Sequence, residues 1–325
     1  MVKTDMRGTG QRANRGWVGV PTFLRSDYCP DPSNIDADIA FFGVPFDEGS
    51  PFAGGSRFAP RSLREHSLRF GGSGGFYDVE RDCSYLAREL SERRIVDLGD
   101  VDILPTNVEG SLANVTALVS VILNQDVFPV ALGGDHTISY PVARAFEGPL
   151  HVVQFDAHLD YAAPNLGMAY TNGQPFRLIH QLEQVTGLTQ VGIRSLRTSK
   201  QAYDDARSAG SQIVTMSELR LRGPTGVAAL VPEGASCYVS VDVDALDIAL
   251  TPGCVSAEPN GMTYGELRDC FAAVARRNEM VGFDFVEVNP LLDAGTGATS
   301  YLGAHLIIEL LGILCEQPWW RARVI

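Results

Sequence analysis

Long hydrophobic runs are missing from this sequence. None of the 325 residues lies in an unbroken stretch of about 18 or more apolar residues, so we expect no membrane span. The N-terminal segment is polar and contains glycine, and it lacks the apolar core of a secretory signal. We therefore predict a cytoplasmic protein.

Paired cysteines are also missing. The six cysteines are spread singly along the chain, with no Cys-x-x-Cys spacing. With 45% hydrophobic residues, a chain of this length can bury a large core without disulfide bonds. We expect reduced thiols and no zinc site built from thiolates.

The sequence has fewer basic than acidic residues. The chain has 26 Lys and Arg against 39 Asp and Glu, which gives a formal net charge of −13. Such a chain is a poor partner for nucleic acid or for an anionic membrane surface, because like charges repel. The charge is compatible with a small cationic substrate, but by itself it identifies no partner.

The sequence shows neither an internal repeat nor a linker between domains. Residues 1–35 are rich in Gly, Pro, Arg and Asp, which predicts an N-terminal arm. Residues 36–325 alternate short apolar strands with helical stretches, so we predict a single α/β domain whose mostly parallel sheet is covered on both faces. We expect strands at 37–44, 94–98, 127–132, 151–155, 190–193, 212–215, 237–241 and 280–288, and helices at 61–69, 108–125, 137–145, 176–184 and 300–314.

The segment that follows the apolar run Val152–Phe155 carries the most specific signal. It places Asp156, His158 and Asp160 at steps of two. In an extended segment such residues point to one side, so two carboxylates and an imidazole converge. Crowded carboxylates repel each other and are costly to bury, and a divalent cation removes both penalties. The alternative is a solvated strand end with ordinary surface acids.

Two other predicted strands end in residues of the same kind. His136 follows the apolar run 130–132, and Asp242 and Asp244 share one side at the end of the strand at 237–241. Ligands of open parallel sheets bind beyond the carboxyl ends of the strands. We therefore expect two histidines and four aspartates to meet at one edge of the sheet.

This set of side chains suits two divalent ions bridged by carboxylates. Oxygen donors with one imidazole per ion favour Mn²⁺, with Co²⁺ or Ni²⁺ as alternatives, and the lack of cysteine ligands disfavours structural zinc. Two ions about 3.5–4 Å apart can hold a bridging water, lower its pKa and present hydroxide to an electrophile.

Three motifs resemble the signatures of the ureohydrolase (arginase/agmatinase) family, in particular its agmatinase-like branch. They are Leu-Gly-Gly-Asp-His-Thr at 132–137, Phe-Asp-Ala-His-Leu-Asp at 155–160, and Ser-Val-Asp-Val-Asp-Ala-Leu-Asp at 240–247. Segments 18–24, 43–47 and 286–290 extend the resemblance over nearly the whole chain. The resemblance implies a three-layer α/β/α fold and a dinuclear manganese site. It further implies hydrolysis of a guanidino group to urea and an amine, by a hydroxide that bridges the ions, in a homotrimer or homohexamer.

The resemblance also assigns roles to particular residues of this chain. The implied metal ligands are His136, Asp156, His158, Asp160, Asp242 and Asp244. Glu287 matches the family's acid that binds the guanidinium of the substrate. A carboxylate suits this planar cation because bidentate pairing fixes the orientation of the cation. We assign Asp160, Glu287 and Asn172 to catalytic positions, and Asn172, Glu258 and Glu287 to contacts with the substrate.

Two loops depart from the family pattern. Asn172 stands where family members that cleave agmatine or arginine have a histidine thought to pass a proton to the leaving amine, and an amide does not titrate. In the loop Cys254–Glu258, which replaces a Thr-Gly-Thr-Pro-Glu run, only the final acid is kept. We therefore expect the metal chemistry to be retained and the substrate to differ from arginine and agmatine. Guanidine, a guanidino acid and a biguanide-type compound are the candidates.

Two alternatives remain open at this point. The chain could be a formimidoylglutamase-like C–N hydrolase, since such relatives also lack the loop histidine. It could also be a low-activity partner subunit that supports an active paralogue in a hetero-oligomer. Metal content does not separate the second alternative from the main hypothesis, because the ligands are intact in both, whereas activity of the homo-oligomer does.

Overall fold

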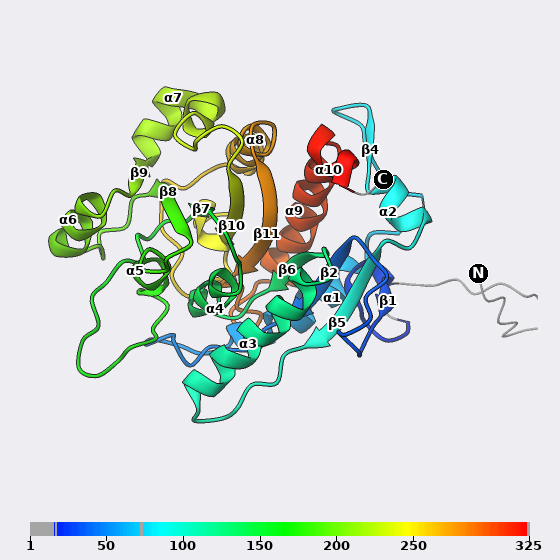
Figure 1. Ribbon diagram of the computed structural model, residues 1–325, viewed down its shortest axis with the longest axis horizontal. Helices are drawn as coiled ribbons and strands as arrows, with labels where there is room; N and C mark the ends of the chain where they lie inside the picture. Colours follow the sequence, from blue (N-terminus) through cyan, green and yellow to red (C-terminus); the bar gives the residue numbers. More distant parts are fainter. Residues whose placement is uncertain (1–15, 17, 72–73, 324–325) are drawn as a thin grey trace, which may run out of the picture.

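A parallel sheet forms the centre of the computed structural model, which describes residues 16, 18–71 and 74–323 (Figure 1). Within these residues nine strands lie in the order β1-β5-β2-β6-β11-β10-β7-β8-β9, and all their pairings are parallel. The predicted fold class is confirmed. The strands are β1 (Asp27–Tyr28), β2 (Ile39–Gly43), β5 (Ile95–Asp100), β6 (Phe128–Leu132), β7 (Leu150–Phe155), β8 (Val185–Ile193), β9 (Gln212–Thr215), β10 (Ser236–Asp242) and β11 (Glu279–Val286).

Helices cover both faces of this sheet, and each face has its own apolar core (Figure 1). Side chains alternate along each strand, so Ile39 and Phe41 of β2 belong to one core and Ala40 and Phe42 to the other. The first core is closed by α1 (Ala59–Ser67), α2 (Ala87–Ser91), α7 (Met216–Ala228), α8 (Tyr264–Ala275), α9 (Ala298–Cys315) and α10 (Pro318–Arg323). The second is closed by α3 (Val108–Leu123), α4 (Ser139–Arg144), α5 (Pro175–Ile179) and α6 (Lys200–Ser208). The three-layer arrangement is therefore confirmed.

Two helix starts follow directly from the local sequence. In α7 the Thr215 hydroxyl accepts a hydrogen bond from the N–H of Glu218, and the Glu218 side chain accepts one from the N–H of Thr215. Thr263 and Glu266 make the same reciprocal pair at the start of α8. Each pair satisfies two N–H groups that the helix itself leaves without a partner.

The boundary between α5 and β8 differs from the prediction. A helix was expected over 176–184, but α5 ends at Ile179, and β8 begins at Val185 instead of residue 190. The reason is pairing with the neighbouring strand, since β7 and β8 pair from Leu150 and Val185, with one register shift before the regular pairing from His151 and Gly187 onward. The hairpin of β3 (Phe76–Asp78) and β4 (Cys83–Tyr85) was not predicted at all, because its strands are too short to show a period.

The described part of the predicted N-terminal arm packs against the sheet. Phe23 is fully buried and stacks on Phe41 with 4.3 Å between ring centroids, and its N–H donates to Asp97 Oδ2 at 2.8 Å. Strand β1 then pairs with β5. Residues 1–15 and 17 of the predicted arm lie outside the described residues, and the division of the chain at residue 35 stays a prediction.

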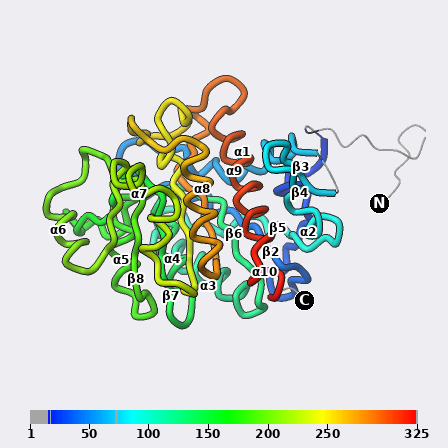
Figure 2. Tube along the Cα trace, turned by 90° about the horizontal axis from the view of Figure 1, so that it is seen from above, coloured from blue at the N-terminus to red at the C-terminus, as the bar shows by residue number. Residues whose placement is uncertain are grey.

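Helix α9 is long and apolar enough to cross a membrane by length and composition alone. In the fold, however, 78% of it is buried, and it lies beside α8 and against α1 (Figure 2). A helix that is apolar all round is expected in the core of a large domain. We therefore identify α9 as a core helix, and the cytoplasmic location stays a prediction.

A buried histidine gives the fold a pH-dependent contribution to stability. His151 in β7 is 4% exposed, lies 2.9 Å from the Thr189 hydroxyl, and burial lowers its pKa to about 4 from the usual 6.5. Between these pH values the unfolded chain binds a proton that the native chain does not, so native stability falls as the pH falls. We expect the unfolding free energy of the wild type to lose up to about 1.4 kcal/mol per pH unit relative to His151→Gln over this window. Denaturant titrations of both proteins from pH 7 to 4 test this, and parallel curves would contradict it.

Candidate metal centre

Four neighbouring strands deliver acids or imidazoles to one edge of the sheet. Along the sheet they are β6, β11, β10 and β7, and they are followed or ended by His136, Glu287, Asp242 and Asp156 respectively. Strands β6 and β7 follow each other along the chain, but in the sheet β11 and β10 lie between them. The connections from strands on the two sides of such a point lead in opposite directions, which leaves a crevice at the carboxyl ends of the strands.

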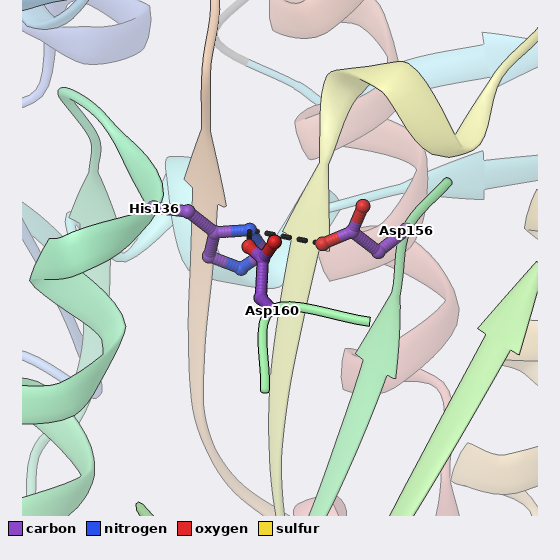
Figure 3. A group of neighbouring side chains, drawn as sticks. All are labelled: His136, Asp156 and Asp160. Carbon is purple, nitrogen blue, oxygen red and sulfur yellow. Dashed lines mark ion pairs between the residues drawn. The ribbon is translucent and has the colours of Figure 1, made fainter. Parts of the chain in front are cut away.

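The first cluster of side chains surrounds the Nδ1 atom of His136 (Figure 3). The Oδ2 atoms of Asp156, Asp160 and Asp242 lie 3.0, 3.1 and 3.1 Å from this nitrogen. The nitrogen is buried, and none of these contacts has the geometry of a hydrogen bond. One nitrogen and three carboxylate oxygens therefore crowd together without a hydrogen bond between them, and the ligand atoms of His136, Asp156 and Asp160 lie within 4.8 Å of one another, close enough to share a cation.

The second cluster surrounds His158 and shares one member with the first. His158 Nδ1 lies 3.0 Å from Asp244 Oδ2 and 3.4 Å from Asp156 Oδ1. Asp156 thus presents one oxygen to each imidazole, as a carboxylate that bridges two ions would. All six residues assigned as ligands from the sequence lie within these two clusters, and their role as ligands stays a prediction.

A chain of hydrogen bonds orients the imidazole of His136. Its Nε2 lies 2.9 Å from the Ser240 hydroxyl, which donates at 2.7 Å to Asp284 Oδ1. Because that hydroxyl gives its own hydrogen to Asp284, it accepts from Nε2, and the lone pair of His136 is left on Nδ1, toward the carboxylates. Neither positioning residue was found from the sequence, although Ser240 lies in a quoted motif and Asp284 interrupts the apolar run of β11.

Without metal ions, the centre holds more buried carboxylates than positive charges. Burial, aided by the Asp156 carboxylate, raises the pKa of Asp160 to about 7. Burial would lower the pKa of His158, but the carboxylates of Asp244 and Asp156 outweigh it and raise that pKa to about 12. These shifts show a buried excess of carboxylates, which divalent cations would neutralise. The residues present therefore fit the pair of ions that the family resemblance implies.

Two glycines allow backbone segments to approach the centre closely. A Cβ on Gly134 would lie 1.8 Å from the carbonyl oxygen of Phe46. A Cβ on Gly49 would lie 2.0 Å from Thr137 Oγ1. The loop after β2 can pack against the Gly-Gly-Asp-His segment only because both positions lack a side chain.

Glu287 presents a free carboxylate oxygen next to the clusters. Its Oε1 accepts from Asn172 Nδ2 and from the backbone N–H of His136, both at 3.0 Å. Its Oε2 is buried with no hydrogen-bond partner among the described residues. The backbone of Glu287 has a φ of +66°, a conformation that is costly for a residue with a side chain; Asp160 of the first cluster shares it, with a φ of +47°. Glu287 and Asn172 also line a cavity of about 240 Å³ that reaches Asp160, Asp242 and Asp244.

Glu258, which the sequence analysis assigned to a contact with the substrate, lies outside this cavity. It accepts from Ser195 Oγ at 2.7 Å and from Arg197 Nε at 3.2 Å. His180, at the end of α5, contacts the Tyr161 hydroxyl at 3.0 Å and is not among the lining residues either. Arg197 lines the cavity, although no pattern in the sequence singled it out.

One cysteine lies closer to the centre than the sequence indicated. A ligand atom of Cys254 is within 4.8 Å of ligand atoms of both Asp242 and Asp244. Burial, together with the charges of Asp244 and Asp242, raises the pKa of its thiol well above the ordinary value. A thiol held neutral in this way is a small apolar neighbour of the carboxylates.

Comparisons with known proteins agree with this geometry. The family model described as "Arginase family" matches residues 37–312. The chain is 32% identical over 309 residues to the mitochondrial guanidino acid hydrolase of Homo sapiens, covering 93% of this chain and 84% of that protein. It is 33% identical over 297 residues to the formimidoylglutamase of Halalkalibacterium halodurans, covering 88% and 89%. The solved structure of proclavaminate amidinohydrolase from Streptomyces clavuligerus matches with a TM-score of 0.82 at 30% identity, covering 92% of this chain and 98% of that one.

These matches and the fold define an amidinohydrolase, an enzyme that cleaves C–N bonds in linear amidines. The chain belongs to the arginase family, the ureohydrolases. The resemblance inferred from the three motifs is thereby confirmed.

Proposed function

We propose that this chain uses two divalent ions, held by the six histidine and aspartate ligands, to hydrolyse a guanidino compound to urea and an amine. The observation that carries the proposal is the buried Nδ1 of His136, surrounded by three carboxylate oxygens at 3.0–3.1 Å without a hydrogen bond. When bound, two divalent ions supply a nucleophile at neutral pH by lowering the pKa of water. Mn²⁺ is the ion we expect, with Ni²⁺ or Co²⁺ as alternatives.

The chain's own residues bind and orient the substrate. The free Oε2 of Glu287 is placed to accept an N–H of the guanidinium, and the bonds from Asn172 and from the His136 backbone hold the Glu287 carboxylate still. Asn172 does not titrate, so it orients groups and does not pass a proton to the leaving amine. Guanidine, which releases the less basic ammonia, therefore needs this proton donor less than agmatine, arginine or a guanidino acid, whose leaving alkylamines are similarly basic.

Urea release by the purified protein, loaded in turn with Mn²⁺ and Ni²⁺, tests the proposal. The panel comprises agmatine, arginine, 3-guanidinopropionate, 4-guanidinobutyrate, guanidine and a biguanide. We expect urea from at least one compound, and least from arginine. Two bound ions per chain with no urea from any compound would contradict the proposal.

Replacing Asn172 tests its positioning role. In Asn172→Ala, Glu287 Oε1 loses one of its two donors, and hydrogen bonds to charged groups contribute about 1.5–3 kcal/mol. We expect kcat/KM for the best substrate to fall about 10- to 100-fold while both ions stay bound. Asn172→His serves as the comparison, since it introduces the titratable group that agmatine-cleaving relatives carry, and it should raise agmatine turnover relative to Asn172→Ala. Full agmatine turnover that survives Asn172→Ala would contradict the role of this loop.

A formimino substrate is the second candidate. It is favoured by the amide at position 172 and by the similarity to a formimidoylglutamase over 88% of the chain. Hydrolysis of an N-formimino amino acid releases formamide in place of urea, so assaying both products from the same incubations separates the two candidates.

The partner-subunit alternative requires the homo-oligomer to be inactive. Activity of the purified chain by itself excludes that alternative. Sedimentation of the same preparation tests the expected homotrimer or homohexamer.

A further inference from the structure

We propose that Arg197 forms an anion-binding subsite that selects substrates carrying a carboxylate on the tail opposite the reacting group. The inference rests on the hydrolase function proposed above and adds a substrate class: guanidino acids, or formimino acids in the second candidate function. Arg197 lies in the loop between β8 and α6 and lines the same cavity as Glu287 and Asn172. It is the one lysine or arginine among the cavity's described lining residues.

The loop that follows the third metal motif holds the Arg197 side chain in place. Its Nη2 donates to the carbonyl oxygen of Ser256 at 2.9 Å, its Nη1 to Ser256 Oγ at 3.3 Å, and its Nε to Glu258 Oε1 at 3.2 Å. Glu258 also accepts from Ser195, so Arg197 shares this carboxylate and does not pair with it by two parallel bonds. The side chain remains 57% exposed. It is thus fixed at one edge and open to a ligand.

One contact of Arg197 involves the imidazole of His158. Nη2 of Arg197 lies 2.7 Å from His158 Nε2. Whenever Nε2 carries a hydrogen, as it does when Nδ1 binds a cation, the two groups face each other as donors, and Glu258 Oε1 lies 3.5 Å from Nε2 as an acceptor. The edge of the Arg197 guanidinium that faces His158 is then available to a carboxylate from the substrate.

The charges of the cavity favour the same class of substrate. The acids that line it, Asp160, Asp242, Asp244 and Glu287, are taken up by the ions and by the guanidinium of the substrate. A cationic tail beside Arg197 would be repelled, whereas an anionic tail would be attracted. Thr198 and Ser199 line the same wall, and Ser199 caps the N-terminus of the nine-residue helix α6. The N-terminal end of that helix adds to the favourable field for an anion.

Three substrates that differ in the charge of the tail test the inference. They are 4-guanidinobutyrate with a carboxylate, butylguanidine with no charge, and agmatine with an ammonium group. In the Mn²⁺-loaded wild type we expect kcat/KM to decrease in this order. For Arg197→Met we expect kcat/KM for 4-guanidinobutyrate to fall about 10- to 100-fold, mainly through KM, while that for butylguanidine changes by less than about threefold. Arg197→Lys should restore part of the preference.

Lys200→Met is the matched control. Lys200 is a neighbouring cation in the same region, but its side chain is 81% exposed, pairs with Asp204 and does not line the cavity. We expect Lys200→Met to keep the wild-type order of kcat/KM for the three substrates. The preference should depend on direct contact between Arg197 and the carboxylate, and not on the general charge of the surface.

A binding measurement gives a readout that does not depend on turnover. The product 4-aminobutyrate should bind the Mn²⁺-loaded wild type more tightly than butylamine does, and Arg197→Met should abolish the difference while it retains both ions. Equal kcat/KM for the three substrates, or an unchanged preference in Arg197→Met, would overturn the anion subsite while leaving the proposed hydrolase intact. If neither the three substrates nor a formimino acid is cleaved, the proposed hydrolase function is wrong. The binding measurement then tests the subsite by itself, and equal binding of 4-aminobutyrate and butylamine would overturn it.

Discussion

Asp156→Asn is expected to lose bound metal and urea release together. Asp156 presents Oδ2 to the His136 cluster at 3.0 Å and Oδ1 to the His158 cluster at 3.4 Å, so it is the carboxylate the two clusters share. The amide removes the negative charge that both clusters share and replaces one of the two oxygens by an NH₂ group, so one ion loses a ligand and both lose a charged partner. We expect metal content to fall from two ions per chain to fewer than one, and kcat to fall by at least about 10⁴-fold. Metal analysis of the dialysed protein and the urea assay measure these quantities.

The control for this variant is another buried aspartate. Asp97 is fully buried and pairs with Arg64 at 2.8 Å, away from the clusters. Asp97→Asn should lower the unfolding free energy, because breaking a buried ion pair costs about 3–5 kcal/mol, yet it should retain two ions per chain. If Asp156→Asn kept both ions, or if Asp97→Asn lost them equally, the assignment of Asp156 as a bridging ligand would be wrong.

Glu287→Gln is expected to retain both ions and lose turnover. Glu287 does not belong to either metal cluster, and its free Oε2 is the buried acceptor we assign to the substrate's guanidinium. Replacing the carboxylate leaves the cation without its charged partner in a buried site, a loss of about 3–5 kcal/mol. We expect kcat/KM to fall about 10²- to 10³-fold or more, with the metal content unchanged.

Glu309→Gln provides the comparison for that variant. Glu309 is also buried, at 5% exposure, but it lies on α9, accepts from the Tyr264 hydroxyl and does not line the cavity. The Glu309→Gln variant should have a kcat/KM within a few-fold of the wild-type value. Near-normal turnover in Glu287→Gln would contradict the role of this acid in binding the guanidinium.

Part of the centre could be predicted because the carboxyl ends of parallel strands meet at one edge of the sheet. The step of two from Asp156 to Asp160 led to the right residues for a wrong reason, since β7 ends before Asp156 and Asp160 has a φ of +47°, so the segment is a loop and not an extended strand. Glu287 was assigned only through the family resemblance. Its strained backbone and its free oxygen depend on contacts with residues more than a hundred positions away, namely His136 and Asn172.

The loops were less accessible to prediction. Arg197 follows β8 in a segment without periodicity, and its contacts to Ser256 and Glu258 exist only because two loops meet above the sheet. The early start of β8 was missed for a related reason, since pairing with β7 outweighs the local preference for helix. In both cases the deciding interaction is distant in sequence and leaves no local pattern.

Anomalous diffraction from crystals grown with Mn²⁺ tests the central claim most directly. The account predicts two peaks per chain about 3.5 Å apart. One would be bound by His136, Asp156, Asp160 and Asp242, and the other by His158, Asp156 and Asp244. A single peak, or peaks at which Asp156 does not contact both ions, would contradict the dinuclear centre on which the proposed function depends.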